Sequence, residues 1–145
     1  MKALLQRVSR ASVTVDSHCM GQIEQGLLVL LGLDRGDNRA AADRMVEKLL
    51  AYRVFADENG RMNRSVADVN GGVLLVSQFT LSANTRSGLR PDFSSALAPG
   101  EAAELFAYTL ALLQQRHARV AAGVFGADMQ VSLVNDGPVT FLLEG

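Results

Sequence analysis

The run Leu27-Leu-Val-Leu-Leu-Gly-Leu33 constrains the fold more than any other segment, because it is apolar on both of its alternating faces. A strand of this kind must be covered on both sides, so we expect it at the centre of a sheet. The run Val73-Leu-Leu-Val-Ser-Gln-Phe79 predicts a second buried strand. Neither run approaches the roughly 20 residues that a membrane span needs. Both are therefore predicted to be core strands, and we expect no membrane partner.

Shorter strand patterns and two helical patterns surround these runs. Helical spacing predicts one helix capped by Asp37 and ending near Tyr52, and a second helix opened by Pro99. The Asn59-Gly60 pair predicts a hairpin turn. Further strands are expected over residues 4–8, 11–15, 129–133 and 139–143, and a loop over residues 84–93. With no internal repeat or shift in composition, the pattern predicts one α+β domain over residues 1–145, with mainly antiparallel sheets and helices packed on one face.

The charge balance restricts the kind of nucleic acid that the chain can bind. The net charge is −1 and the isoelectric point is about 6.1. Proteins that wrap nucleic acid carry a clear basic excess, so bulk binding to DNA or RNA is disfavoured and no DNA partner is expected. Recognition of one exposed nucleotide end needs only a pocket and a few local charges, such as Arg7, Arg10, Arg86 and Arg90.

The residues that usually carry metal, redox or triad chemistry are sparse. Cys19 is the only cysteine, and the two histidines, His18 and His117, have no partner at ligand spacing. His117 follows a helical pattern, which predicts a solvated residue near the helix C-terminus. The N-terminal segment lacks the apolar core of a secretory signal. We therefore expect a cytoplasmic protein with no metal site and no cofactor.

Two short segments stand out from this background. Ser77-Gln-Phe-Thr-Leu81 closes a buried strand with polar residues, which on its own fits a structural strand end as well as a site. Gly137-Pro138 separates two strand patterns, and because proline lacks a donor the backbone must leave the sheet there. A trans peptide is the default for this proline, since the cis form accounts for about 5 to 6 per cent of X-Pro bonds.

Taken together, the two segments resemble the D-aminoacyl-tRNA deacylase family, in which a Ser-Gln-Phe-Thr and an Asn-x-Gly-Pro-Val-Thr motif occur in this order. Here they are Ser77–Thr80 and Asn135–Thr140. Residues 6–15, 26–32, 90–93 and 128–134 also look like family sequence, so the resemblance covers essentially the whole chain. It implies a barrel-like, homodimeric fold and an editing hydrolase. The implied partner is aminoacyl-tRNA, whose 3′-terminal adenosine carries a D-amino acid or glycine.

The resemblance also implies roles for named residues. Ser77, Gln78, Phe79 and Thr80 would form the catalytic segment, with backbone N–H groups around Gln78 to Thr80 as an oxyanion hole and the terminal 2′-hydroxyl of the RNA helping to activate water. In the family the Gly-Pro unit is cis and reaches into the partner subunit's pocket, where Gly137 and Pro138 would exclude L-amino acids. Arg7 resembles the arginine that holds this unit, although on its pattern alone it also fits a surface charge.

Three alternatives remain open at this stage. Thr80 would be a covalent nucleophile if a base lay within hydrogen-bond reach, and the sequence suggests none. A noncatalytic RNA-end-binding protein would stack bases on Phe79 and Phe93 and contact phosphates through Arg86 and Arg90. A small-molecule esterase or amidase would use the same backbone donors on free esters.

Overall fold

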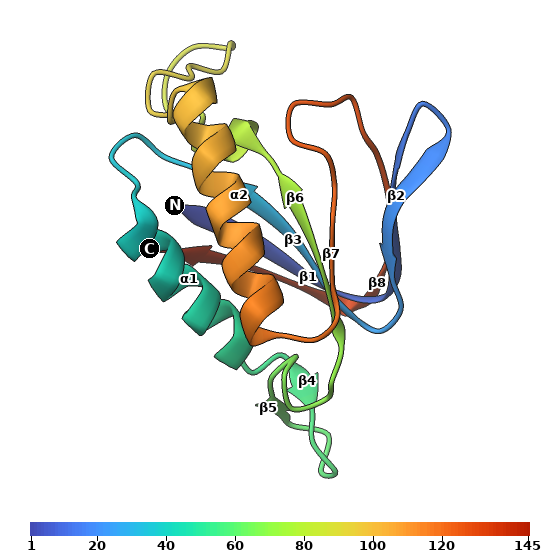
Figure 1. Ribbon diagram of the computed structural model, residues 1–145. Coiled ribbons are helices and arrows are strands. Elements are labelled where there is room, and N and C mark those ends of the chain that lie inside the picture. The colour runs from blue at the N-terminus through green and yellow to red at the C-terminus, as the bar shows by residue number, and fades with distance from the viewer.

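The computed structural model describes residues 1–145 and is dominated by one curled sheet, covered on one face by two helices (Figure 1). The strand order is β2-β1-β3-β6-β7, and β8 pairs with the other edge of β1. β1 runs antiparallel to β2, β3 and β8, whereas β3, β6 and β7 are parallel. β2 also contacts β7, which brings the sheet close to a closed barrel. The strands are β1 (Lys2–Val15), β2 (His18–Ile23), β3 (Gly26–Gly32), β6 (Gly72–Ser77), β7 (Val120–Ala122) and β8 (Gln130–Glu144).

The two buried strands lie where the sequence predicts them. β3 lies between β1 and β6, and all of its residues are buried except Leu30, which is partly buried. Gly26 pairs with Gly72 so closely that a Cβ at Gly26 would overlap the backbone of Gly72. This contact requires glycine and fixes the register of the parallel pair β3–β6, which in turn fixes where β6 ends.

The outer strands differ from the sequence-based prediction. The two short strands expected at each end of the chain are single long strands, β1 and β8, and the β8 pairing is interrupted where Gly137-Pro138 leaves the ladder. β2 and β7 were not predicted at all. β2 is largely exposed and mixes polar and apolar residues without alternation, and β7 has only three half-buried residues, so neither shows the pattern that identifies a strand.

Helices α1 (Arg39–Ala51) and α2 (Pro99–Arg116) pack against each other and against the sheet, as predicted. The predicted cap is displaced by one residue. Asn38 accepts a hydrogen bond from Ala41 N at 3.0 Å, while the Asp37 carboxylate accepts from Asp34 N at 2.7 Å. The other predicted boundaries are confirmed, since α1 ends at Ala51 with Tyr52 as its C-cap and α2 opens with Pro99. Neither helix combines the length and apolarity that a membrane crossing requires.

The core has two parts, one on each side of the sheet. A cluster of 23 buried residues fills the space between the sheet and the helices, and a cluster of seven fills the inside of the curl. A small hairpin of β4 (Phe55–Ala56) and β5 (Met62–Arg64) turns at Gly60, where φ is +77°, as the Asn-Gly pair predicts.

His117 is not solvated, contrary to the prediction. It is 8% exposed, and its Nε2 lies 2.6 Å from the carbonyl oxygen of Gly71. The chain turns back into β7 directly after α2, which carries the ring over the turn that enters β6. The imidazole therefore ties the end of α2 to the sheet and takes no part in a site.

Acid is expected to weaken the fold partly through Asp34. Burial raises the pKa of this carboxyl, but hydrogen bonds from the N-terminal ammonium and Lys2 outweigh burial and lower the pKa below its usual 3.8. A carboxyl with a lowered pKa stabilises the folded state above its unfolded pKa and loses this contribution as the pH falls through the folded pKa. We expect Tm to fall less steeply between about pH 5 and 2 in Asp34→Asn than in the wild type. Thermal unfolding followed by circular dichroism tests this, and parallel curves would contradict it.

Candidate active site

The Ser77–Thr80 motif lies where β6 leaves the sheet. The N–H of Gln78 still donates to the Leu31 carbonyl at 2.8 Å, and the chain then turns into the short 3₁₀ helix η1 (Phe79–Ser82). The first N–H groups of a helix have no acceptor within it. Phe79 and Thr80 therefore present two adjacent backbone donors at the end of a rigid, buried strand.

This geometry reduces the number of backbone donors that are available for the predicted oxyanion hole. Three N–H groups were expected to contribute, but that of Gln78 is already used in the sheet. The side-chain amide of Gln78 is also engaged, because Nε2 donates to Thr80 Oγ1 at 2.5 Å. The donors left for a substrate oxygen are the N–H groups of Phe79 and Thr80.

The Thr80 hydroxyl has no base beside it. Its hydrogen bond comes from the Gln78 amide, which cannot remove a proton, and no carboxylate or imidazole is hydrogen-bonded to it. An unassisted threonine hydroxyl is a weak nucleophile. The geometry therefore favours water over Thr80 as the attacking group.

A cavity of about 680 Å³ opens beside these donors. Its wall combines the end of β6, the segment before α2 and the loop between β7 and β8, and most of its lining residues are apolar. The rings of Phe79 and Phe93 lie 4.9 Å apart at its rim. Its size and apolar lining are typical of a small-molecule or nucleoside site.

Gly137 and Pro138 form a protrusion on β8. Asn135 pairs with Val8, and Thr140 pairs with Gln6. Residues 136–139 of β8 therefore lie opposite a single residue of β1, Arg7, and form a bulge in the ladder. The Gly137–Pro138 peptide is cis, as the family resemblance implies and contrary to the default for an X-Pro bond. The backbone leaves the ladder at this point, as the proline predicts.

Two side chains hold the protrusion at its base. Arg7 Nε donates to Asp136 O at 3.0 Å, and Arg7 Nη1 donates to Val54 O at 2.8 Å. Asn135 Nδ2 donates to the carbonyls of Arg7 and Val139 at 3.1 and 3.0 Å, and Asn135 Oδ1 accepts from Val139 N at 3.1 Å. The sequence pattern predicts a role for Arg7 but not for Asn135. The only hint was that Asn135 begins the motif. We call the hydrogen bonds that these two side chains make at the base of the protrusion the bracket.

One chain does not bring the two motifs together. Arg7, which holds the protrusion, pairs with Leu27, and Leu27 pairs with Val73 near the start of β6. Ser77, which begins the other motif, lies at the opposite end of β6. Four residues along a strand span about 13 Å. The lining of the 680 Å³ cavity includes neither Gly137 nor Pro138. The protrusion therefore lies apart from the pocket of its own chain.

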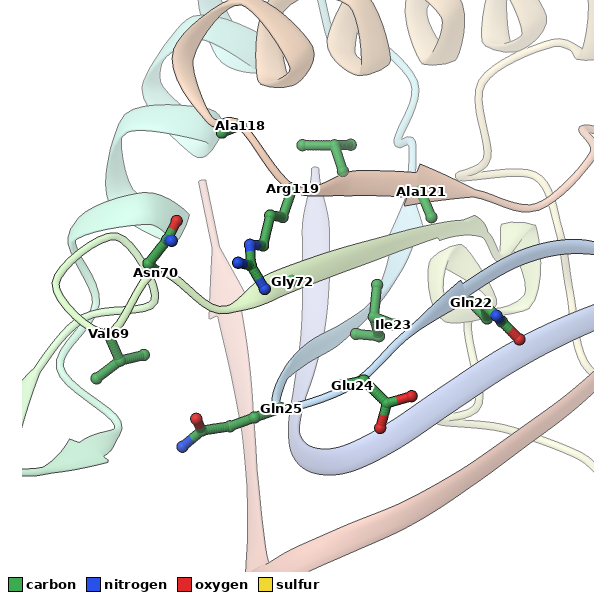
Figure 2. Close-up of a pocket in the computed structure, with 11 residues that line it drawn as sticks. Gln22, Ile23, Glu24, Gln25, Val69, Asn70, Gly72, Ala118, Arg119 and Ala121 are labelled. Carbon is green, nitrogen blue, oxygen red and sulfur yellow. The ribbon is translucent and has the colours of Figure 1, made fainter.

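A second cavity of about 510 Å³ lies at the opposite end of the curled sheet (Figure 2). Its polar side chains come from the turn between β2 and β3 and from Asn70 and Arg119. In Figure 2 the side chains of Glu24 and Gln25 point in different directions. No two polar groups converge on a single point, so this cavity lacks the arrangement of a catalytic site.

Comparisons with known proteins agree along the whole chain. The family model of D-Tyr-tRNA(Tyr) deacylase matches residues 4–144. Proteins named D-aminoacyl-tRNA deacylase from Cellvibrio japonicus (strain Ueda107) and Pseudomonas putida (strain W619) are 58% and 61% identical, each over 99% of both chains. A solved structure named c-Myc DNA Unwinding Element Binding Protein has a TM-score of 0.96 at 42% identity, covering 100% of this chain and 99% of its own.

A more distant structure, described as a probable eukaryotic D-amino acid tRNA deacylase, has a TM-score of 0.85 at 16% identity over 98% of this chain and 97% of its own, which shows the fold alone. The shared fold, the full-length relatives and the two free donors beside an apolar pocket define the class of this protein, which is a hydrolase. The chain belongs to the D-Tyr-tRNA(Tyr) deacylase family.

Proposed function

We propose that this protein hydrolyses the ester of D-aminoacyl-tRNA, releasing the free D-amino acid and tRNA, and that it also accepts glycyl-tRNA mischarged on tRNA(Ala). The observation that carries the proposal is the pair of N–H groups of Phe79 and Thr80, held by β6 at the mouth of an apolar pocket. Full-length relatives named for this activity support it. We propose a cytoplasmic location, where the tRNA substrate is found.

The chemistry requires little from the side chains. Water attacks the ester carbonyl, the 2′-hydroxyl of the terminal adenosine helps to remove a proton from this water, and the oxyanion accepts hydrogen bonds from the N–H groups of Phe79 and Thr80. The bond to the ribose oxygen then breaks, and that oxygen takes up the proton that the water gave up and leaves as the 3′-hydroxyl. An aminoacyl ester is already activated, so donors placed for the developing charge supply the main assistance. Ser77 and Gln78 act by setting the end of β6 and the position of Thr80.

Selection of D-amino acids requires a wall, because enantiomers carry the same groups, and a difference of one methylene in contact is worth only about 1 to 3 kcal/mol. We assign this wall to Gly137 and Pro138 of the partner subunit. The protrusion stands away from its own pocket, which is what a contribution to a second copy needs. An L side chain would meet the wall, whereas glycine has no side chain to clash.

The proposal requires a homodimer, and β8 offers a surface for one. Its second edge is unpaired, and Val134, Phe141 and Leu142 on this strand are 42%, 37% and 48% exposed. A second copy would cover these side chains and bring each protrusion to the other subunit. A fully active monomer at assay concentration would contradict this assembly.

The test is to incubate the purified protein with matched D- and L-tyrosyl-tRNA and with glycyl-tRNA, and to follow release of the amino acid. We expect cleavage of the D and glycyl substrates while the L form is spared. Cleavage of none would favour an RNA-end-binding protein. Equal cleavage of free D-aminoacyl esters would favour a general esterase, and efficient cleavage of the L substrate would contradict the wall.

A further inference from the structure

The loop between η1 and α2 contains a closed excursion over residues 84–92. Asn84 N donates to Asp92 O at 2.7 Å, and Asp92 N donates to Asn84 O at 3.2 Å, so the two ends are joined. Every residue of the excursion is exposed, and Gly88 at its turn has a φ of +73°. The excursion buries no side chain, so the hydrophobic core does not explain it.

The base of this excursion lies at the rim of the active-site pocket. Phe93 follows Asp92 directly, lines the pocket and contacts Phe79. The Asp92 carboxylate accepts hydrogen bonds from Ser94 N at 3.0 Å and Ser94 Oγ at 2.7 Å, which fixes the exit from the excursion. The excursion therefore ends directly beside a residue that lines the pocket.

Each arm of the excursion carries one arginine at the same distance along the sequence from the closing pair. Arg86 lies two residues after Asn84, and Arg90 lies two residues before Asp92. Neither guanidinium makes an ion pair, and the Asp92 carboxylate is turned toward Ser94. Elsewhere Arg7 is bound to backbone carbonyls and Arg64 to Glu58. The excursion thus presents two unpaired cations on a loop whose base lies at the rim of the pocket.

We propose that the 84–92 excursion binds the backbone phosphates of the single-stranded 3′ end of tRNA and guides the terminal aminoacyl-adenosine into the pocket. The inference rests on the proposed function. A chain with a net charge of −1 cannot hold RNA by overall attraction, so its phosphate contacts must be local. Arginine suits this role because its planar fork of donors matches a phosphate group.

The test compares two substrates with one chemistry, D-tyrosyl-tRNA and the D-tyrosyl ester of adenosine, which has no phosphate. In Arg86→Gln/Arg90→Gln we expect KM for D-tyrosyl-tRNA to rise about tenfold near 0.1 M salt, with kcat unchanged. The salt slope of log kcat/KM should flatten by about 1.4, which is two phosphates at 0.7 each for single strands. Cleavage of the adenosine ester should not change.

The matched control is Arg44→Gln, which removes an exposed arginine from α1 and should leave both substrates unaffected. An unchanged KM and salt slope in the double variant would overturn the inference. So would an equal loss with the adenosine ester, because that would show damage to the pocket. A wild-type protein that cleaves neither ester would instead overturn the proposed function, and the inference with it.

Discussion

Replacing Phe79 with proline is expected to lower kcat for D-aminoacyl-tRNA by about 10²- to 10³-fold relative to Phe79→Ala, the usual cost of one oxyanion donor. Both variants lose the aromatic ring, but only proline also removes the N–H. Proline is tolerated at the first position of a helix, where its missing donor has no partner in the helix. Gln78, with φ −143° and ψ 85°, lies outside the helical region that proline disfavours in its preceding residue.

The comparison separates the donor from the ring. Phe79→Ala should raise KM through the lost contact with Phe93 and leave kcat nearly intact, since the backbone donor remains. Equal kcat values in the two variants, with unfolding curves like that of the wild type, would show that this N–H does not stabilise the oxyanion. A Thr80→Ala variant that binds substrate but has no activity would restore the nucleophile hypothesis.

The parts of the fold that could be predicted are those with strong periodicity. β3, β6 and both helices are apolar on the faces that they bury, so their sequences show where they lie. β2 could not be found because it lies at an exposed position and its polar residues do not alternate with apolar ones. The cap of α1 was placed one residue early because Asp37 and Asn38 are both good caps. The Asp37 carboxylate instead accepts hydrogen bonds from the buried N-terminal ammonium and from Asp34 N, which leaves Asn38 as the cap.

The sequence predicts which residues form the candidate site, but it does not predict the hydrogen bonds that these residues make. The two motifs name Ser77 to Thr80 and Gly137-Pro138, yet the use of the Gln78 N–H depends on Leu31, which lies 47 residues earlier. The hydrogen bond of the buried His117 imidazole likewise depends on a distant residue, Gly71. Such pairings follow from the register of distant strands, which local sequence does not encode. The separation of the two motifs within one chain could be seen only in the structure.

The protrusion of β8 is rigid because the ladder continues on both sides of it. β1 and β8 pair from Thr14 to Val8 on one side and from Gln6 to Lys2 on the other. Between these stretches Arg7 and Asn135 fix the carbonyls of Asp136 and Val139. The proposed function makes this protrusion the wall that rejects one enantiomer. Such a wall must be positioned to a fraction of an ångström, and the hydrogen bonds of Arg7 and Asn135 would supply that precision. Discrimination should therefore be more sensitive than stability to changes at Gly137.

Gly137→Ala is expected to lower the ratio of kcat/KM for D- over L-tyrosyl-tRNA by about 10- to 100-fold, since a misplacement of about 1 Å can cost 10²-fold. Gly137 has a φ of +149°, which side chains rarely allow. A Cβ there would lie 2.6 Å from Val139 Cγ2 and 2.7 Å from Val139 N. Val139 N is the group that donates to Asn135 Oδ1, so relieving the clash must move the protrusion within its bracket.

Gly60→Ala supplies the matched control. Gly60 also has a positive φ, +77°, but a Cβ there meets nothing within 4 Å, so the variant adds backbone strain without touching the protrusion. It should lower Tm and leave the D-to-L ratio unchanged. The ratio is the decisive quantity, because a fold that is merely weakened loses both rates together. A folded, dimeric Gly137→Ala protein with the wild-type ratio would place the chiral filter elsewhere in the pocket.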